Sequence, residues 1–442
     1  MDGSVSQQRA YDELSRARAR ILAFVEEVTD AELRRQWLPI LSPMVWDLAH
    51  VGNYEDLWLV QTLAGERVTP AGLDELYDAF RQPRDVRESL PLLGPDEART
   101  YITAVRDRSL RAIDDGLLDP ARAATEGELL RDGFVLGLVV QHEHQHAETI
   151  LQARQAMGER ATALEHVGAT AASTRTAAAA LPGEQPLATR WLHHPGGTGT
   201  IGTSADPWAY DNERPAHAVS IDPFRIARDA VTNAQWIEFI EAGGYTEPGW
   251  WHPDGWQAVA DDALTAPAGW RPSGDGTWQA CTFGAWHEVD PAAPVQHVSW
   301  WEADAFARFA GARLPTELEW EAAARWRPDG STAPESRLDG ANVGARYDGP
   351  VAPGLLTAEP SPCGCRAMLG NTWEWTASRF EPWPGFTVFP YAEYSKEFFG
   401  GNYRVLRGGS WATDELVCRS TFRNWDHPQR RQLFAGLRLA DG

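Results

Sequence analysis

The sequence predicts an α+β protein of two domains, a helical bundle followed by a domain with little regular secondary structure. The chain has 442 residues, which is long enough for two domains. Apolar residues recur at helical spacing through the first third of the chain, whereas glycine, proline and tryptophan are frequent after Trp191. We therefore expect a bundle over residues 1–157, a connector over 158–188 and the second domain over 189–442.

Four amphipathic segments predict the helices of the bundle. In each segment the apolar residues recur every three or four positions, so that one face of the helix is apolar. The segments cover residues 11–28, 45–57, 96–113 and 134–146. Long helices with short connections are typical of an up-and-down four-helix bundle, in which facing helices can present metal ligands inward.

The connector and two later helices complete the predicted local structure. Residues 158–188 are rich in alanine and threonine, lack a useful apolar face, and end in proline and glycine. One later helix is expected over residues 301–310. Another is expected to run to about residue 325, because Thr316 and Glu319 form a capping box before it. Elsewhere we expect short strands and long loops packed around aromatic residues.

Composition argues against several classes of function. The formal net charge of −22 argues against nucleic acid as a partner. Four scattered cysteines do not indicate a disulfide-stapled secreted fold. The N-terminus lacks a secretory signal pattern, and no apolar run is long enough to span a bilayer. We therefore expect a cytoplasmic protein without membrane contact; its oligomeric state stays open, with a monomer favoured.

A metal site is predicted from the run Gln141–His146, which contains three of the 12 histidines of the chain. His142 and His146 lie four residues apart, so their imidazoles project from one helix face and can bind one metal ion. His50, in another helical segment, is the best candidate for a third ligand. Three neutral histidines leave coordination positions open on a divalent metal, as catalysis requires.

The same run also fits the zinc-protease pattern, in which Glu143 between the two histidines would be the general base. A protease of that type takes its third ligand from a downstream loop, whereas the strongest third candidate here, His50, lies upstream. We therefore regard the protease as the weaker interpretation.

The second half resembles the formylglycine-generating, sulfatase-modifying enzyme family. Four segments carry the resemblance in order, namely Pro294–Trp300, Arg313–Glu321, Gly370–Thr376 and Arg404–Trp411. The first half looks like a DinB-like bundle, a superfamily that often binds metal through three histidines. The C-type-lectin-like fold implied for the second half agrees with its few regular elements.

The two halves in this order are similar to the ergothioneine-pathway sulfoxide synthases, also called hercynine oxygenases. The resemblance covers essentially the whole chain. It implies Fe(II) at His50, His142 and His146, with O2 as co-substrate. It further implies that the sulfur of gamma-glutamylcysteine is joined to the imidazole of hercynine (N-alpha-trimethylhistidine), in a site formed where the bundle meets the second domain.

The resemblance also assigns roles to three polar residues. Tyr391 matches the family's catalytic tyrosine, whose phenol would donate a proton and favour carbon–sulfur bond formation over oxidation of the thiol alone. Tyr394 matches a tyrosine that contacts the trimethylated substrate. Gln145, beside His146, would hydrogen-bond the substrate without bringing charge near the metal. Taken without the family, both tyrosines read as packing aromatics and Gln145 as an ordinary helix residue.

Substrate recognition is expected in the segment Asn424–Pro428. A quaternary ammonium group cannot donate a hydrogen bond and is recognised by aromatic faces and negative charge. Asn424 and Trp425 therefore suit hercynine. Asp426 suits an ammonium group, which the family places at the amino end of the thiol substrate. A buried tryptophan with a capping aspartate is the structural alternative.

Arginines are expected to bind the two carboxylates of gamma-glutamylcysteine, because guanidinium groups form bidentate contacts with carboxylates. By resemblance this pair is Arg84 and Arg87, but the same spacing fits Arg81 and Arg84. Arg430 is a further candidate. An exposed basic stretch is the structural alternative.

Several other functions stay open. Formylglycine-generating enzymes use two cysteines, and here Arg423 stands five residues after Cys418, where the second would lie, so that activity is not expected. Cysteine or a selenium donor could replace gamma-glutamylcysteine, and histidine could replace hercynine. The two arginines argue against plain cysteine, which has a single carboxylate. A zinc-dependent thiol transferase or hydrolase, or a binding module with a structural metal, is possible on the same scaffold.

Overall fold

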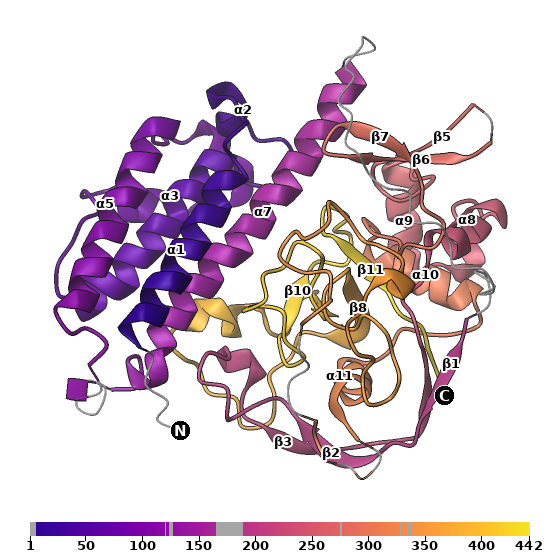
Figure 1. Cartoon of the computed structure of the whole chain (residues 1–442). Coiled ribbons are helices and arrows are strands. Elements are labelled where there is room, and N and C mark those ends of the chain that lie inside the picture. The colour runs from indigo at the N-terminus through magenta and orange to yellow at the C-terminus, as the bar shows by residue number, and fades with distance from the viewer. Residues whose placement is uncertain are drawn as a thin grey trace. The chain divides into compact units, whose positions relative to one another are not determined.

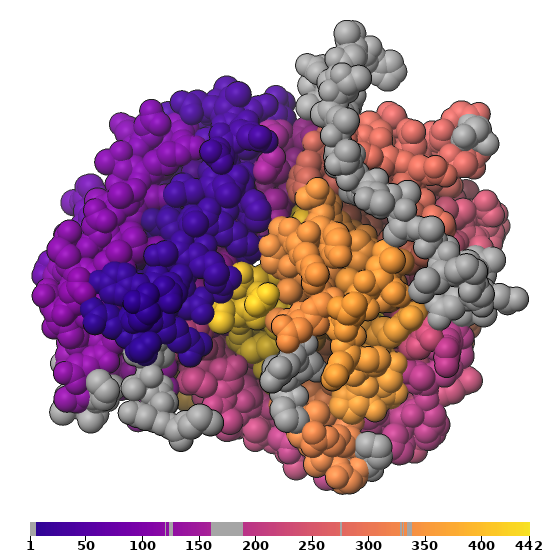
Figure 2. Space-filling model, viewed as in Figure 1, coloured from indigo at the N-terminus to yellow at the C-terminus, as the bar shows by residue number. Residues whose placement is uncertain are grey.

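The computed structural model divides the chain into two compact units (Figure 1). Unit 1 contains the chain up to Ala161 together with Ala205–Trp208, and unit 2 contains the rest. In Figure 2 the main part of unit 1 is indigo to purple, and unit 2 runs from magenta through orange to yellow. The structure describes residues 6–119, 121–122, 127–164, 189–274, 276–327, 329, 331–333 and 338–442.

Unit 1 is built from helices. The four predicted segments correspond to the four long helices α1, α3, α5 and α7, with shorter helices between them. The elements are α1 (Gln7–Ala23), α2 (Asp30–Arg34), α3 (Met44–Glu55), π-helical η1 (Asp56–Leu63), α4 (Leu73–Leu76), η2 (Arg84–Ser89), α5 (Pro95–Asp114), η3 (Arg131–Gly133) and α7 (Phe134–Leu164).

Helix bounds differ from the sequence prediction at two places. Helix α1 ends at Ala23, and Val25 and Val28 are buried in the turn that follows, before Thr29 caps α2. Helix α7 continues to Leu164, into the stretch where the connector is expected to begin. Most of that predicted connector, residues 165–188, lies outside the described residues.

Four charged side chains, one from each long helix, meet inside unit 1. Arg18 of α1 and Arg106 of α5 each bind both Glu55 of α3 and Glu143 of α7, with N–O distances of 2.6–3.0 Å. All four side chains are at most 9% exposed. We call them the Arg–Glu quartet. Removing one partner would leave uncompensated charge in the interior, so the quartet fixes how the four helices pack.

Unit 2 has short strands in small sheets, as the sequence predicts. Among the described residues the strand orders are β1-β4-β12, β10-β9-β8-β11, β2-β3 and β5-β6-β7. The strands are β1 (Trp191–His194), β2 (Gly197–Ile201), β3 (His217–Ile221), β4 (Phe224–Ala227), β5 (Trp270–Pro272), β6 (Trp278–Thr282), β7 (Ala285–Glu288), β8 (Trp373–Arg379), β9 (Arg404–Arg407), β10 (Asn424–Asp426), β11 (Ala435–Leu437) and β12 (Ala440–Asp441).

Short helices connect these strands. Helix α10 occupies the predicted position, and α11 begins after Thr316, whose capping box with Glu319 is formed. The helices are η4 (Asp211–Glu213), α8 (Asn233–Glu241), η5 (Pro248–Trp250), α9 (Pro253–Asp261), α10 (Trp300–Phe309), α11 (Glu317–Arg325), η6 (Pro353–Leu355), η7 (Ala392–Tyr394) and η8 (Lys396–Phe398). None of the described helices in either unit is long and apolar enough to cross a membrane.

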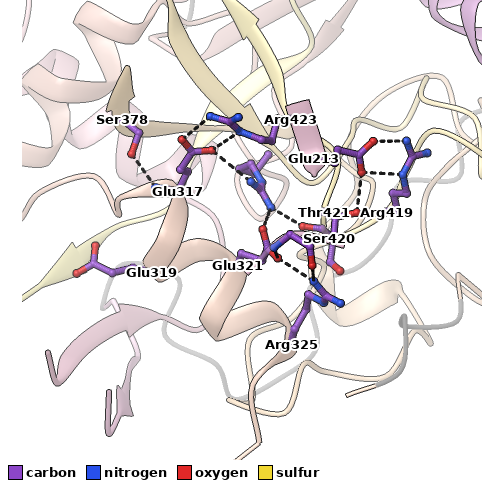
Figure 3. Close-up of polar contacts among 12 residues, drawn as sticks. Glu213, Glu317, Glu319, Glu321, Arg325, Ser378, Arg419, Ser420, Thr421 and Arg423 are labelled. Atoms are coloured by element: carbon purple, nitrogen blue, oxygen red, sulfur yellow. Dashed lines mark hydrogen bonds and ion pairs between the residues drawn. The ribbon is translucent and has the colours of Figure 1, made fainter. Parts of the chain in front are cut away.

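Buried arginine–glutamate pairs hold the loops of unit 2 against α11 (Figure 3). Arg423 binds both oxygens of Glu317 at 2.8 and 2.9 Å, and Arg407 binds Glu321 at 2.6 Å. These two arginine side chains are completely buried. Because Arg423 directly precedes β10, its pairing with Glu317 anchors the strand that carries Asn424, Trp425 and Asp426.

Candidate metal site and substrate-contact residues

His50, His142 and His146 gather in one cluster inside unit 1. One nitrogen from each imidazole lies within 4.8 Å of the other two, a spacing that could hold one metal ion. The ring centroids of the three pairs are 4.5–4.9 Å apart. Helix α7 supplies two of the imidazoles on one face because four residues complete about one turn, and α3 supplies the third. The predicted ligand set is thus brought together.

Hydrogen bonds orient two of the three rings. The Nδ1 atom of His50 lies 2.7 Å from the carbonyl oxygen of Tyr77, and Nδ1 of His146 lies 2.9 Å from Oδ1 of Asp47. A backbone carbonyl oxygen and a carboxylate oxygen are both acceptors. Both Nδ1 atoms therefore carry the hydrogen, and both Nε2 atoms keep a lone pair for a metal. Such partners fix the tautomer and the direction of a metal-binding histidine.

His142 provides an independent test of whether a metal fits. Its Nδ1 is buried and has no hydrogen-bond partner among the described residues, although Tyr54 stacks on the ring with centroids 3.7 Å apart. A buried polar atom of this kind usually has a partner, and a cation bound to this nitrogen would be one. Desolvation lowers the pKa of both His50 and His142 well below the usual value, which favours the neutral, metal-binding form.

Glu143 does not support the zinc-protease interpretation. Its two carboxylate oxygens accept hydrogen bonds from Arg18 and Arg106 within the Arg–Glu quartet, and the residue is 1% exposed. A general base must reach its substrate and hold an available lone pair. His144, the remaining histidine of the run, lies outside the cluster and contacts Arg20 instead.

The three arginines of the 81–87 segment have different surroundings. Arg81 is exposed and already forms ion pairs with Glu75 and Asp78. Arg84 is exposed and donates to the carbonyl oxygen of Ile40. Arg87 is 4% exposed, and the acceptors that it contacts are neutral: Gln82, Ala79 and Ser42.

The Arg87 guanidinium lies close to the metal-site histidines. It sits 3.6 Å from the ring centroid of Trp46, and that indole also stacks on His50 with centroids 4.4 Å apart. Desolvation lowers the pKa of Arg87 to about 10, so the side chain is still cationic at neutral pH. Among the described residues its hydrogen-bond acceptors are neutral, and a buried cation with neutral acceptors is suited to bind an anionic ligand.

Gln145 follows His142 by three residues, so the two lie on the same side of α7. It is also the immediate neighbour of His146. Its side chain is partly exposed. It could therefore contact a ligand held at the histidine cluster.

The predicted aromatic residues gather in unit 2. Tyr391 and Tyr394 form an edge contact with centroids 6.2 Å apart, and Tyr394 meets Trp425 edge-on at 5.9 Å. Trp425 in turn stacks on Phe380 at 4.1 Å. Tyr391, Tyr394 and Trp425 are each partly exposed as residues, so this cluster is packed but not fully buried.

Polar residues of β10 and the following turn border the aromatic cluster. Asn424 accepts from the backbone N–H of Trp425, and Asp426 accepts from the N–H of His427. Arg430 lies 3.4 Å from Asp426 and forms an ion pair with it. The next residue, Arg431, is bound to Glu302 inside unit 2.

The structure argues against cysteine-pair chemistry. Cys418 is 2% exposed and its thiol contacts the carbonyl oxygen of Gly408 at 3.1 Å. Arg423, at the position of the second cysteine, is buried and bound to Glu317.

Sequence reasoning missed the groups that orient the histidines. Asp47, the Tyr77 carbonyl, Tyr54 and Trp46 all contact the cluster. Asp47 lies three residues before His50 but bonds to His146 on another helix, so local spacing gave no signal for its role. Tyr77 contacts His50 through its backbone carbonyl, which every residue type has, so the sequence could not indicate this contact.

Comparison with known proteins supports the two-part architecture. Residues 13–150 match the DinB superfamily, and residues 178–442 match the sulfatase-modifying factor enzyme 1-like domain. A helical bundle with a three-histidine cluster, followed by such a domain, defines the two-domain class to which this chain belongs. The matches confirm the predicted α+β fold class.

Full-length relatives narrow the class. The chain is 44% identical to a hercynine oxygenase of Mycolicibacterium smegmatis, with 99% of each chain covered, and 44% identical to one of Mycobacterium tuberculosis, with 97% of each covered. A formylglycine-generating enzyme of Streptomyces coelicolor is 31% identical over 61% of this chain. The chain belongs to the hercynine oxygenase family and is an oxygenase.

Proposed function

We propose that this oxygenase joins the sulfur of gamma-glutamylcysteine to the imidazole of hercynine in ergothioneine biosynthesis. The histidine cluster of unit 1, in a chain related over its whole length to hercynine oxygenases, is the observation that carries the proposal. One O2 accepts four electrons as the sulfoxide forms: one oxygen atom goes to sulfur and the other leaves as water. The N-terminal unit and the C-terminal unit would both be required for turnover.

His50, His142 and His146 would hold Fe(II). Fe(II) at this position would supply activation of dioxygen and stabilisation of a substrate thiolate. Asp47 and the Tyr77 carbonyl would keep the Nε2 lone pairs of two ligands directed inward. Three imidazoles leave the remaining coordination positions for substrates.

Arg87 and Arg84 would bind the carboxylates of gamma-glutamylcysteine. Arg87 is a buried cation whose hydrogen-bond acceptors are neutral, and the indole of Trp46 contacts both its guanidinium and the ring of His50. This register is favoured over Arg81 and Arg84 because Arg81 is already paired with Glu75 and Asp78. Asp426 and Arg430, which pair with each other, would contact the charged amino-acid end of the same substrate.

The aromatic cluster of unit 2 would recognise hercynine. The aromatic rings of Tyr394 and Trp425, which meet edge-on, would attract the positive charge of a trimethylammonium group. Asn424 and Gln145 would supply neutral hydrogen-bonding groups for the imidazole and the carboxylate of that substrate.

Tyr391 would act as a proton donor through its phenolic oxygen. Delivery of a proton during oxygen reduction would favour carbon–sulfur bond formation over oxidation of the thiol alone. The edge contact with Tyr394 places this phenol beside the residue proposed to contact hercynine.

The decisive experiment uses the full chain, loaded anaerobically with Fe(II), then mixed with hercynine, gamma-glutamylcysteine and air. We expect the sulfoxide conjugate by mass spectrometry, and its absence would contradict the proposal. His50→Ala should lose the bound metal and the product together, whereas the exposed His193→Ala should keep both. Tyr391→Phe should divert the reaction toward oxidised thiol, and an unchanged product ratio would remove Tyr391 from its role.

A further inference from the structure

Asp211 is a buried acidic residue of unit 2 with no role in the chemistry above. It is 2% exposed, at the start of η4. Neighbouring buried carboxylates are neutralised by arginines: Glu213 by Arg419, and Glu317 by Arg423 (Figure 3). Asp211 instead accepts hydrogen bonds from Phe389 and Ser395, which lie in a distant segment of the chain. Burying a carboxylate in this way is costly, so its position calls for an explanation.

Both donors flank Tyr391 in the sequence. Oδ2 of Asp211 accepts from the backbone N–H of Phe389 at 3.2 Å, and Oδ1 accepts from the hydroxyl of Ser395 at 2.5 Å. We call residues 389–395 the tyrosine loop. A single carboxylate therefore binds this loop at its first and last residues, on both sides of Tyr391.

The residues on either side of Asp211 contact the same loop. The side-chain amide of Asn212 donates to the Ser395 hydroxyl at 3.0 Å. The ring of Tyr210 stacks on Tyr394 with centroids 4.1 Å apart and planes inclined by 20°. Three consecutive residues thus hold the tyrosine loop by three different kinds of interaction.

The turn that carries Asp211 is itself firmly held. Glu213 accepts from the Arg419 guanidinium and from the hydroxyl of Thr421 at 2.6 Å, as Figure 3 shows. The carbonyl oxygen of Asn212 accepts from Arg423 at 2.9 Å. Because Arg423 directly precedes β10, the same turn is tied to the strand that carries Asn424, Trp425 and Asp426.

We propose that Tyr210, Asp211 and Asn212 position the tyrosine loop for the oxygenase reaction, with Asp211 as the principal positioning residue. They do not touch substrate; they fix where the phenol of Tyr391 and the ring of Tyr394 stand relative to Trp425. The inference rests on the proposed function, because positioning matters only if Tyr391 takes part. A displacement of about 1 Å at a reacting group can lower a rate up to about a hundredfold.

The test compares Asp211→Ala and Ser395→Ala with Asp222→Asn, which changes an exposed aspartate of the same unit. Deuterium uptake of peptides covering 386–399 measures whether the loop is held, and the ratio of sulfoxide to oxidised thiol measures the reaction. We expect faster uptake in both loop variants, a product ratio shifted in the direction of Tyr391→Phe, and sulfoxide formation on the order of tenfold slower. The Asp222→Asn protein should behave as the parent does.

Unchanged deuterium uptake in a folded Asp211 or Ser395 variant would overturn the proposal. It would also be overturned if such a variant took up deuterium faster but kept the parent's product ratio, provided that Tyr391→Phe shifts that ratio. If Tyr391→Phe itself leaves the ratio unchanged, the role proposed for Tyr391 fails and uptake alone decides whether Asp211 holds the loop. Ser395→Ala removes a single oxygen atom, so it carries the test if Asp211→Ala does not fold. Metal content, measured in every variant, separates a loop effect from loss of the histidine cluster.

Discussion

The two units place their candidate residues on different kinds of support. In unit 1 the three histidines project from long helices, whose backbone groups are satisfied within each helix, and the Arg–Glu quartet links those helices through side chains. In unit 2 Tyr391, Tyr394 and Trp425 stand on short 3-10 turns and a three-residue strand. There, buried ion pairs and single hydrogen bonds must supply the order that helices supply in unit 1.

The comparison teaches where each unit is sensitive to substitution. Charges inside unit 1 fix the packing of whole helices, so changing one should affect global stability. Side chains such as Asp211 in unit 2 hold one loop, so changing one should affect local order and catalysis. The following predictions test that division, in order of decreasing expected effect.

Glu143→Gln should have the largest effect on stability. It leaves Arg18 and Arg106 only partly compensated in the interior, and breaking a buried ion pair in this way costs about 3–5 kcal/mol. The free energy of unfolding from denaturant titration measures the loss. The control Glu75→Gln removes an exposed partner of Arg81 and should cost less than about 1 kcal/mol. Equal losses in the two variants would show that the quartet contributes no more than a surface pair.

Asp211→Asn should change how stability depends on pH. Burial raises the pKa of Asp211 from 3.8 to about 6, so the folded state disfavours ionisation. Its stabilising contribution is present below pH 3.8 and is lost as the pH rises through 6. Between pH 4 and pH 7 the parent should lose roughly 2 kcal/mol relative to the asparagine variant. Melting curves of both proteins at several pH values measure the difference, and parallel pH profiles would contradict it.

Arg84→Ala should have the smallest effect, confined to one substrate. Loss of a charge-assisted contact to a carboxylate should raise KM for gamma-glutamylcysteine about tenfold, with little change in KM for hercynine. Arg81→Ala is the matched control, since Arg81 is also exposed in the same segment but is paired with Glu75 and Asp78. If Arg81→Ala had the larger effect, the register of the arginine pair would be Arg81 and Arg84.

Much of unit 1 was predictable because one physical pattern dominates it. Apolar spacing located all four long helices, and the four-residue separation of His142 and His146 predicted a shared helix face, which the cluster with His50 confirms. The π-helical continuation η1 after α3 was not predicted, because a change from α to π winding leaves little trace in apolar spacing.

Unit 2 was predictable in its helices and motifs but not in its contacts. The capping box at Thr316 and Glu319 depends on neighbouring residues and is confirmed. The contacts of Asp211 with Phe389 and Ser395 join residues more than 170 positions apart, and single-sequence patterns carry no information about such pairs. For the same reason the sequence could not tell that Arg81 forms ion pairs while Arg87 donates to neutral acceptors.

The Arg–Glu quartet has a consequence for how the proposed metal would bind. Since each long helix contributes one charged member, no helix can separate from the bundle without exposing or stranding a charge that the other three share. The imidazoles on α3 and α7 therefore keep their spacing in the apoprotein. Metal binding would then not be coupled to folding. The heat-capacity change of metal binding, measured by calorimetry, should therefore be close to zero.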